Sequence, residues 1–420
     1  MKSNITHNSI IKYKYIFTIL VVSLGLFYGC FIGSSMITMV ATTVICLFLL
    51  FCKNDVLLPS MLYFSSFAYM FQANSLMLYE FPCIIFMCRV FVKEKRKQSF
   101  LLFWFVIYFI THIISSGVTL TNIIPIIYIL IILISCISYK KELYDSCVKM
   151  FLLGVFISSL LGLLKPFSPH LIELLAEDFA EGMSIDFVIR FSGLSYDPNF
   201  YTIGVIISIM ILLFSEYQKT WLILFLAVVY SCFGAITYSK SYILSLCIVF
   251  LLYFLDGKTN MSKKILLFAV LGCLLSASFL DEIIYVFKGR FNGVSDINSL
   301  TTGRNELWGL YLSHIGDTLT TLLFGHGLNS IVGEKVAHNT YIQMLYNFGI
   351  IGCIVDFLYI KKCYRLLNRT GLSMVSVGII FVIIMLLFNL SAYTFPSLWG
   401  CLTMIFILIS KRSMNYVVNS

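Results

Sequence analysis

The chain has 420 residues, of which 60% are hydrophobic and only 12% are charged, and its formal net charge is +9. A soluble domain of this length could not bury so much apolar surface, because single cores stop growing well below this size. Nor does the positive charge indicate nucleic-acid binding, since the basic residues form small clusters between apolar runs instead of one basic face. Composition therefore predicts an integral membrane protein.

Apolar runs fill most of the chain, and about fourteen of them are long enough to cross a bilayer as helices. Because a backbone in lipid must satisfy its own hydrogen bonds, we expect an all-α polytopic protein with about 12–14 transmembrane helices in a single membrane domain, 1–420. The third run is short and could be re-entrant. The runs are 14–31, 34–52, 57–72, 75–92, 99–116, 119–138, 147–165, 198–214, 220–236, 241–255, 264–281, 338–360, 373–391 and 394–410.

Lysine and arginine clusters predict the orientation of these runs. If the N-terminus is inside, every even connection is cytoplasmic, and these connections carry the clusters at 93–97, 140–141 and 361–369. The alternation follows the positive-inside rule, so both termini are expected in the cytoplasm. The lysines before the first run are typical of a signal peptide, but no small-residue cleavage site follows, so we expect this run to remain as the first helix.

Two outward connections, 166–197 and 282–337, are much longer than the others, and function usually concentrates in such loops. In the first, Ser168 and Pro169 predict the start of a short helix that ends at Gly182. The second contains an amphipathic pattern over about 303–315, whose aromatic residues suit a membrane–water interface.

The first candidate constellation closes the first long loop. Asp197 and Pro198 predict an N-cap and first turn for the next span, with Asn199 following. Capping does not explain Arg190, which lies on the outer side, where positive charge is disfavoured. A guanidinium beside the N–H groups of a helix start is suited to bind a phosphate.

The second constellation lies on the 303–315 helix. Arg304 begins this helix, and Trp308 and Tyr311 follow one and two turns later on the same side. An interfacial arginine of this kind could also simply extend to the headgroups. Arg290 in the same loop and Lys240 in an outward turn add further positive charge.

The third constellation is at the point where the second loop re-enters the membrane. His326 lies between two glycines that allow close packing, and His338 opens a span, followed by Asn339 and Tyr341. A helix N-terminus disfavours the imidazolium, so the His338 ring should be mostly neutral and able to accept a proton from a hydroxyl. A capping role is the alternative. No metal site or cofactor is predicted, because the acidic residues of the first loop are best interpreted as a solvated helix face.

Together these features resemble the O-antigen polymerase and O-antigen ligase superfamily of bacterial envelope proteins. The segments that carry the resemblance are Arg190…Gly193…Asp197-Pro-Asn, Gly303-Arg304…Trp308, Gly325-His-Gly and His338-Asn-Thr-Tyr341, with Leu345, Gly349 and Gly352 after them. They cover the C-terminal two thirds, and each is short. The resemblance implies a multi-pass protein of the bacterial cytoplasmic membrane, similar to membrane-embedded C-type glycosyltransferases, with its active site facing the periplasm.

The family resemblance implies metal-independent, inverting transfer of a glycan from undecaprenyl diphosphate, with arginines on the diphosphate and the histidine activating the acceptor. We therefore expect Arg190, Arg304 and His338 to be catalytic. The residues expected to contact the substrate are Asp197, Asn199, Lys240, Arg290, Trp308, Tyr311, His326, Asn339 and Tyr341. A polymerase would move the growing chain onto a lipid-linked repeat unit, with a possible chain-length regulator as a partner, and a ligase would move it onto lipid A–core. From a different class, a flippase for lipid-linked oligosaccharides is the alternative, although the intramembrane charged residues are scattered and the two halves of the chain differ.

Overall fold

A computed structural model describes residues 2–73, 76–94, 97–113, 120–175, 191–214, 220–256, 264–265, 304–328, 330–333, 336–367, 374–388 and 397–418. The protein is an all-α helical bundle. Its α-helices are α1 (Lys2–Phe31), α2 (Ser35–Phe51), α3 (Asn54–Phe64), α4 (Glu80–Lys93), α5 (Gln98–Ile113), α6 (Leu120–Ser138), α7 (Tyr144–Gly162), α8 (Pro169–Leu174), α9 (Pro198–Phe214), α10 (Thr220–Ala235), α11 (Lys240–Leu255), α15 (Arg304–His314), α16 (Leu319–Phe324), α17 (Thr340–Leu367), α18 (Met374–Phe388) and α19 (Leu398–Val418).

The predicted apolar runs correspond closely to these helices, and the main difference lies at the third run. There α3 ends at Phe64, and a 3-10 helix, η1 (Ser65–Met70), leads into a short antiparallel hairpin of β1 (Gln72–Ala73) and β2 (Leu76–Met77). The predicted span 264–281 lies outside the described residues apart from 264–265. Two further short 3-10 helices are η3 (Lys141–Leu143) and η4 (Lys165–Phe167).

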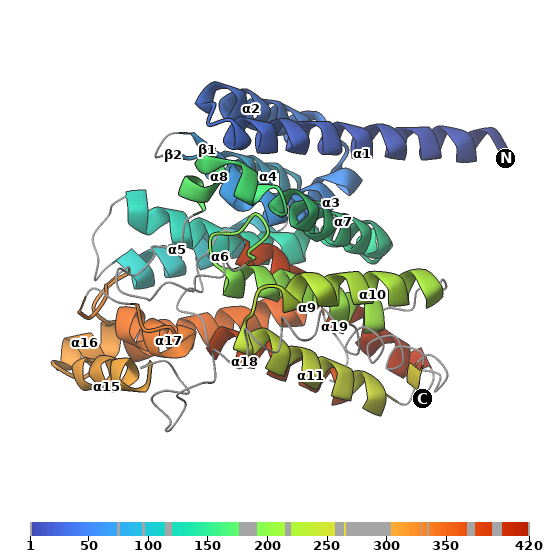
Figure 1. The fold of residues 1–420 in the computed structure, drawn as a ribbon. Coiled ribbons are helices and arrows are strands. Elements are labelled where there is room, and N and C mark those ends of the chain that lie inside the picture. Colours follow the sequence, from blue (N-terminus) through green and yellow to red (C-terminus); the bar gives the residue numbers. More distant parts are fainter. Residues whose placement is uncertain are drawn as a thin grey trace.

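The helices run broadly alongside one another, and α1 begins at the same end of the bundle at which α19 ends (Figure 1). The hairpin, α15 and α16 are at the opposite end. Among the described helices α9 is the most enclosed, and every residue from Tyr201 to Phe214 is buried. It packs against α7, α10, α11 and α19, and a helix that is apolar all round needs such an enclosed position.

Large apolar side chains also cover the outside of the bundle. Met36 is 76% exposed, Phe51 82% and Phe357 64%. Monomeric soluble proteins rarely show apolar surface on this scale. In addition, the helical stretches 14–31, 141–167 and 340–367 are long and apolar enough to cross a membrane, and several shorter apolar helices accompany them. These features fit a helical membrane protein.

Charged side chains inside the bundle have polar neighbours. Glu80 accepts a hydrogen bond from the Tyr128 hydroxyl (2.6 Å), and Asp356 accepts one from the Tyr108 hydroxyl (2.5 Å). Arg89 donates to the carbonyls of Leu49 (2.6 Å) and Cys52 (2.9 Å) and so satisfies the C-terminal end of α2. The arginine therefore has a structural role. The side chain of His112 lies outside the described residues.

Candidate functional site

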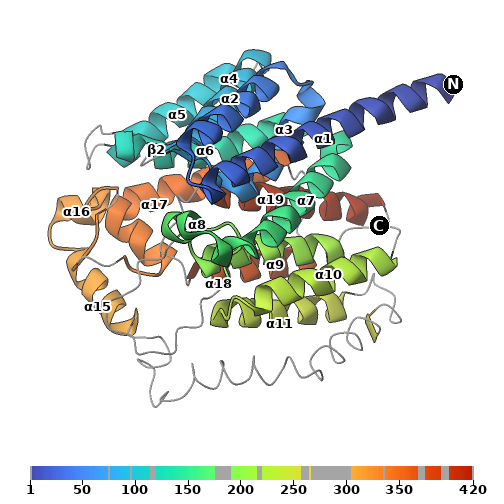
Figure 2. The ribbon, with the colours of Figure 1, turned by 45° about the horizontal axis from the view of Figure 1, so that its top comes forward.

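The candidate site is built on a small unit made of α15, α16 and the first part of α17. Figure 2 shows α15 and α16 lying beside the beginning of α17, at one end of the bundle. The unit has a hydrophobic cluster of its own, formed by Tyr311, Ile315, Ala337 and Tyr346, separate from the main core. The predicted helix at 303–315 is confirmed as α15, and its Tyr311 is fully buried in this cluster.

Tyr311 lies on the predicted apolar face of this helix and is a packing residue of the unit. Its ring packs edge-on against Tyr346, with 4.9 Å between centroids. Its hydroxyl accepts a hydrogen bond from the Val332 N–H at 3.2 Å. Burial raises the pKa of Tyr311 above its ordinary value, although that hydrogen bond opposes the shift.

His338 lies at the entry to α17 and has a backbone conformation that few residues adopt. Its φ is +47°, in the left-handed region, which is uncommon for residues other than glycine and is found repeatedly at functional sites. The residue before it is held at both polar groups: the Ala337 carbonyl accepts from Trp308 Nε1 (2.8 Å), and the Ala337 N–H donates to Gln343 Oε1 (2.9 Å). The side chain of His338 is half-buried.

The residue after His338 caps the helix. Asn339 Oδ1 accepts from the backbone N–H groups of Tyr341 (3.0 Å) and Ile342 (3.2 Å), and Asn339 is 1% exposed. This is the geometry of an N-cap, which satisfies donors that the first turn leaves unpaired. Asn339 therefore has a structural role, and its contact with substrate stays a prediction. The capping role considered for His338 is therefore filled by Asn339.

The glycine–histidine–glycine motif at 325–327 packs against a break in α17. Gly349 has φ +61° and ψ −169°, so the helix is interrupted there. A Cβ on Gly325 would lie 2.3 Å from the Asn347 carbonyl carbon, which explains why glycine is needed. The break exposes carbonyls, and the loop supplies their donors: His326 N–H bonds to Tyr346 O (2.8 Å) and Gly327 N–H to Asn347 O (2.9 Å).

His326 is accordingly a scaffold residue of this unit. Its ring stacks on Tyr346, with 4.2 Å between centroids and 14° between planes. Its Nε2 lies 2.9 Å from the carbonyl oxygen of His314, which can only accept, so Nε2 carries the proton. The predicted contact of His326 with substrate therefore competes with a role in joining α15, α16 and α17.

Gln343 was missed by the sequence reasoning, although its buried side chain makes three hydrogen bonds within the unit. Besides the bond with Ala337, its Nε2 donates to the carbonyl of Ser330 (3.0 Å) and to Asn347 Oδ1 (2.9 Å). The side chain is 4% exposed. A glutamine inside an apolar run is a weak signal in one sequence, but a polar residue in such a run usually faces the inside of the bundle.

The remaining residues of this group lie around the same entry. Arg304 is the first residue of α15, one turn before Trp308, and is half-buried. Tyr341 is 40% exposed, and its hydroxyl donates to the carbonyl of Ile384 on α18 (3.3 Å). The structure thus brings together seven of the predicted residues: Arg304, Trp308, Tyr311, His326, His338, Asn339 and Tyr341.

A second group lies where α9 and α11 begin. Asp197 accepts from the Asn199 N–H and caps α9, as predicted from the sequence. Asn199 Oδ1 accepts from the Ser239 hydroxyl (2.8 Å), and the Ser239 oxygen also caps α11 through the Tyr242 N–H. Just before Ser239, Tyr238 has φ +50°, and with His338 it is one of two non-glycine residues at positive φ in the described part of the chain.

Other predicted residues cannot be placed. Arg190 and Arg290 lie outside the described residues, and so does the side chain of Lys240, whose backbone begins α11. The first-loop helix is α8, which Ser168 caps as predicted, but it ends at Leu174, with Leu175 as its C-cap, and not at Gly182. Lys165, another residue missed from the sequence, donates to the Leu175 carbonyl (3.1 Å) and so holds α8 against the end of α7.

Helix α18 shows where the group around His338 lies relative to the group at the start of α9 and α11. Near its first residues, Gly378 packs against Leu252 close to the end of α11, so the two helices run antiparallel and α11 begins near the end of α18. Ile384, which Tyr341 contacts, is also near that end. Both groups therefore lie at the same end of the bundle, with the last turns of α18 between them.

Comparisons with known proteins add no family to this picture. No protein-family model, no curated protein and no solved structure matches the chain. Within the described ranges, no three histidine, cysteine, aspartate or glutamate side chains are grouped so that they could hold a metal ion.

Proposed function

We propose that this protein is an O-antigen polymerase, a metal-independent glycosyltransferase of the bacterial cytoplasmic membrane with both termini in the cytoplasm and its active site on the periplasmic side. The observation that carries the proposal is the left-handed backbone conformation of His338 at the entry to α17, which the contacts of the neighbouring residues hold in place. A neutral imidazole there could accept a proton from a hydroxyl. The motif resemblance supplies the substrate class, an undecaprenyl-diphosphate-linked glycan.

The arrangement around His338 supports the assignment of roles. Trp308 contacts the residue before His338, and Arg304 is one turn away on the same helix. A guanidinium near the base is well suited to the charge that develops on a departing diphosphate, because it can bind two phosphate oxygens at once. Arg190 is assigned to the same diphosphate by the motif resemblance alone.

In the proposed reaction, a hydroxyl of the acceptor sugar attacks the anomeric carbon of the donor glycan. The new C–O bond forms as the bond to undecaprenyl diphosphate breaks, with inversion at that carbon. His338 takes the hydroxyl proton, and the diphosphate leaves with the electron pair of the broken bond. Removing a general base of this kind slows a reaction about 10²–10⁴-fold.

The first experiment is the banding pattern of lipopolysaccharide from the host strain with the gene deleted and then restored as variants. We expect His338→Ala, Arg304→Ala and Arg190→Ala to lose the ladder and retain core plus a single repeat unit, with protein levels unchanged. His314→Ala is the matched control, since the His314 side chain is on the exposed part of α15 and contacts Asp317.

The outcomes separate the alternatives. Bare core with long glycan accumulating on undecaprenyl diphosphate would identify a ligase in place of a polymerase. A normal ladder in the His338→Ala strain would refute the role of His338, and an unchanged ladder in the deletion strain would refute both enzymes for that polysaccharide. Purified wild-type protein that elongates a lipid-linked repeat unit without added metal would confirm the chemistry directly.

A further inference from the structure

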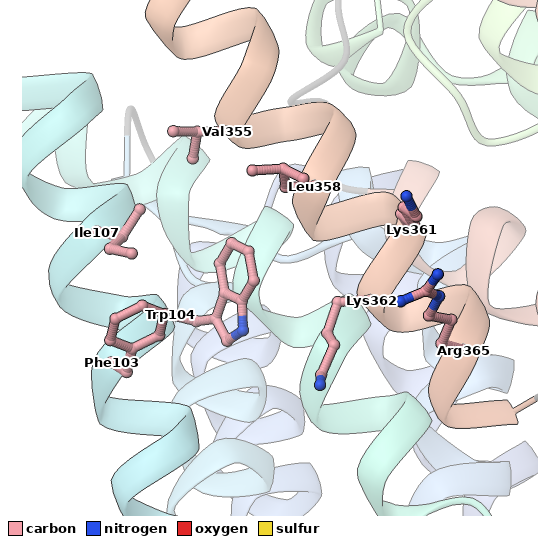
Figure 3. Close-up of a pocket in the computed structure, with 8 residues that line it drawn as sticks. All are labelled: Phe103, Trp104, Ile107, Val355, Leu358, Lys361, Lys362 and Arg365. Carbon is pink, nitrogen blue, oxygen red and sulfur yellow. The ribbon is translucent and has the colours of Figure 1, made fainter.

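A cavity of about 340 Å³ opens between α5 and the second half of α17 (Figure 3). Its apolar wall includes Phe103 and Ile107 on α5 and Val355 and Leu358 on α17. These positions on α17 are more than four helical turns beyond His338, so the cavity is separate from the candidate site. Its volume is at the lower end of the range for ligand pockets, roughly 300–1,000 Å³.

The cavity is a groove that opens to the outside of the bundle. Phe103 is 56% exposed and Leu358 is 48% exposed. In a membrane protein, such a surface contacts lipid chains. The groove is therefore accessible to the acyl chains of the surrounding lipids.

Three basic residues line one part of the groove: Lys361, Lys362 and Arg365. The Lys362 ammonium lies 4.8 Å from the centre of the Phe100 ring, which keeps it beside the opening. Among the described residues, no carboxylate lies within 4 Å of any of the three, and no acidic residue lines the cavity. The positive charge at the groove therefore has no acidic counterpart in the described part of the protein.

Trp104 provides an independent indication of a ligand. It lines the groove and is only 8% exposed, yet its Nε1–H has no hydrogen-bond acceptor among the described residues. The indole N–H can only donate, and a buried donor without a partner is costly and therefore rare. In Figure 3 this nitrogen is on the side of the ring nearer to Lys362.

We propose that the groove binds an anionic glycerophospholipid of the cytoplasmic leaflet. One acyl chain occupies the apolar wall, and the phosphodiester lies among Lys361, Lys362 and Arg365. Trp104 donates its N–H to a phosphate or ester oxygen at the junction of head and tail. Basic pockets between membrane helices bind anionic headgroups in this way. The proposal depends on the membrane orientation but not on glycosyl transfer.

The test is a native mass spectrometry titration of the full-length protein in detergent with phosphatidylglycerol, phosphatidylcholine and undecaprenyl diphosphate, each used separately. We compare the triple variant Lys361→Gln/Lys362→Gln/Arg365→Gln with Lys53→Gln/Lys140→Gln/Lys141→Gln. The second set removes the same charge from exposed residues at the same end of the bundle. Each basic residue near a membrane surface strengthens lipid binding about fivefold, so the groove variant should bind phosphatidylglycerol about 100-fold more weakly.

Two further variants probe the groove without changing its charge. Ile107→Trp fills the apolar wall and should abolish tight binding. Trp104→Phe removes one donor and should weaken binding about tenfold. The proposal is overturned if the two triple variants bind alike, if phosphatidylcholine binds as tightly as phosphatidylglycerol, or if undecaprenyl diphosphate binds in its place. These outcomes leave the glycosyltransferase proposal untouched, since chain elongation is not measured.

Discussion

The buried glutamine of the candidate site offers the sharpest test of how the protein holds His338. Replacing Gln343 by leucine keeps a similar volume but removes three hydrogen bonds, to the Ala337 N–H, the Ser330 carbonyl and Asn347 Oδ1. Ala337 and Asn347 are both buried, at 0% and 4% exposure. Their polar groups would therefore lose a partner that water cannot replace.

The expected cost follows from these two buried groups. A buried donor or acceptor without a partner costs about 1–3 kcal/mol, so the variant should lose about 2–6 kcal/mol of local stability. The Ser330 carbonyl is half-buried and can be reached by water, so it adds little. With Ala337 released on one side, His338 would no longer be fixed, and a displacement of about 1 Å costs roughly 10²-fold in rate.

Hydrogen exchange of the detergent-purified protein measures the local effect, and lipopolysaccharide ladders measure the functional one. We expect faster exchange in the segment 330–345 and shortened or absent chains. Gln98→Leu is the matched control, because Gln98 makes one exposed hydrogen bond, to the Phe91 carbonyl. Unchanged exchange at Ala337 together with a normal ladder would show that Gln343 does not position His338, and the reasoning above would be wrong.

Three further predictions concern the scaffold. Gly349→Ala should lower the melting temperature, because Gly349 is at positive φ and a Cβ there would lie 2.5 Å from the Leu323 carbonyl carbon, whereas Gly309→Ala, in open space on α15, should raise it slightly. Tyr108→Phe removes the hydroxyl that donates to Asp356 and should cost about 1–3 kcal/mol of unfolding free energy, while Tyr28→Phe, 55% exposed, should cost almost nothing. Folding raises the pKa of Tyr311, so the contribution of its neutral hydroxyl to the free energy of unfolding is complete below about pH 10 and is lost as the pH rises further. Tyr311→Phe should therefore show a smaller fall in melting temperature above pH 10 than the wild type.

The helices could be predicted from the sequence because their length and apolar character are set by the membrane itself. The hairpin after η1 could not, since two-residue strands leave no periodic pattern. The break at Gly349 was missed for a related reason: glycine is frequent in membrane helices and usually leaves them intact. The loop 325–327 packs against the break and donates hydrogen bonds to the carbonyls that the interruption leaves without helical partners.

The sequence signals at the candidate site differ in how local they are. Asp197 was recognised as a cap because Asp–Pro is a local signal for a helix start. The cap formed by Asn339 is equally local, because its partners are two and three residues further along the chain. The contacts of His326 join separate helices, so no short motif encodes them.

The conformation of His338 links this scaffold to the proposed chemistry. A left-handed backbone at a non-glycine residue is maintained only when its neighbours fix it, and here Ala337 is held on both sides and Asn339 is committed to capping α17. The structural roles of Asn339 and Gln343 therefore strengthen the proposal for His338, since they fix the residues on either side of it.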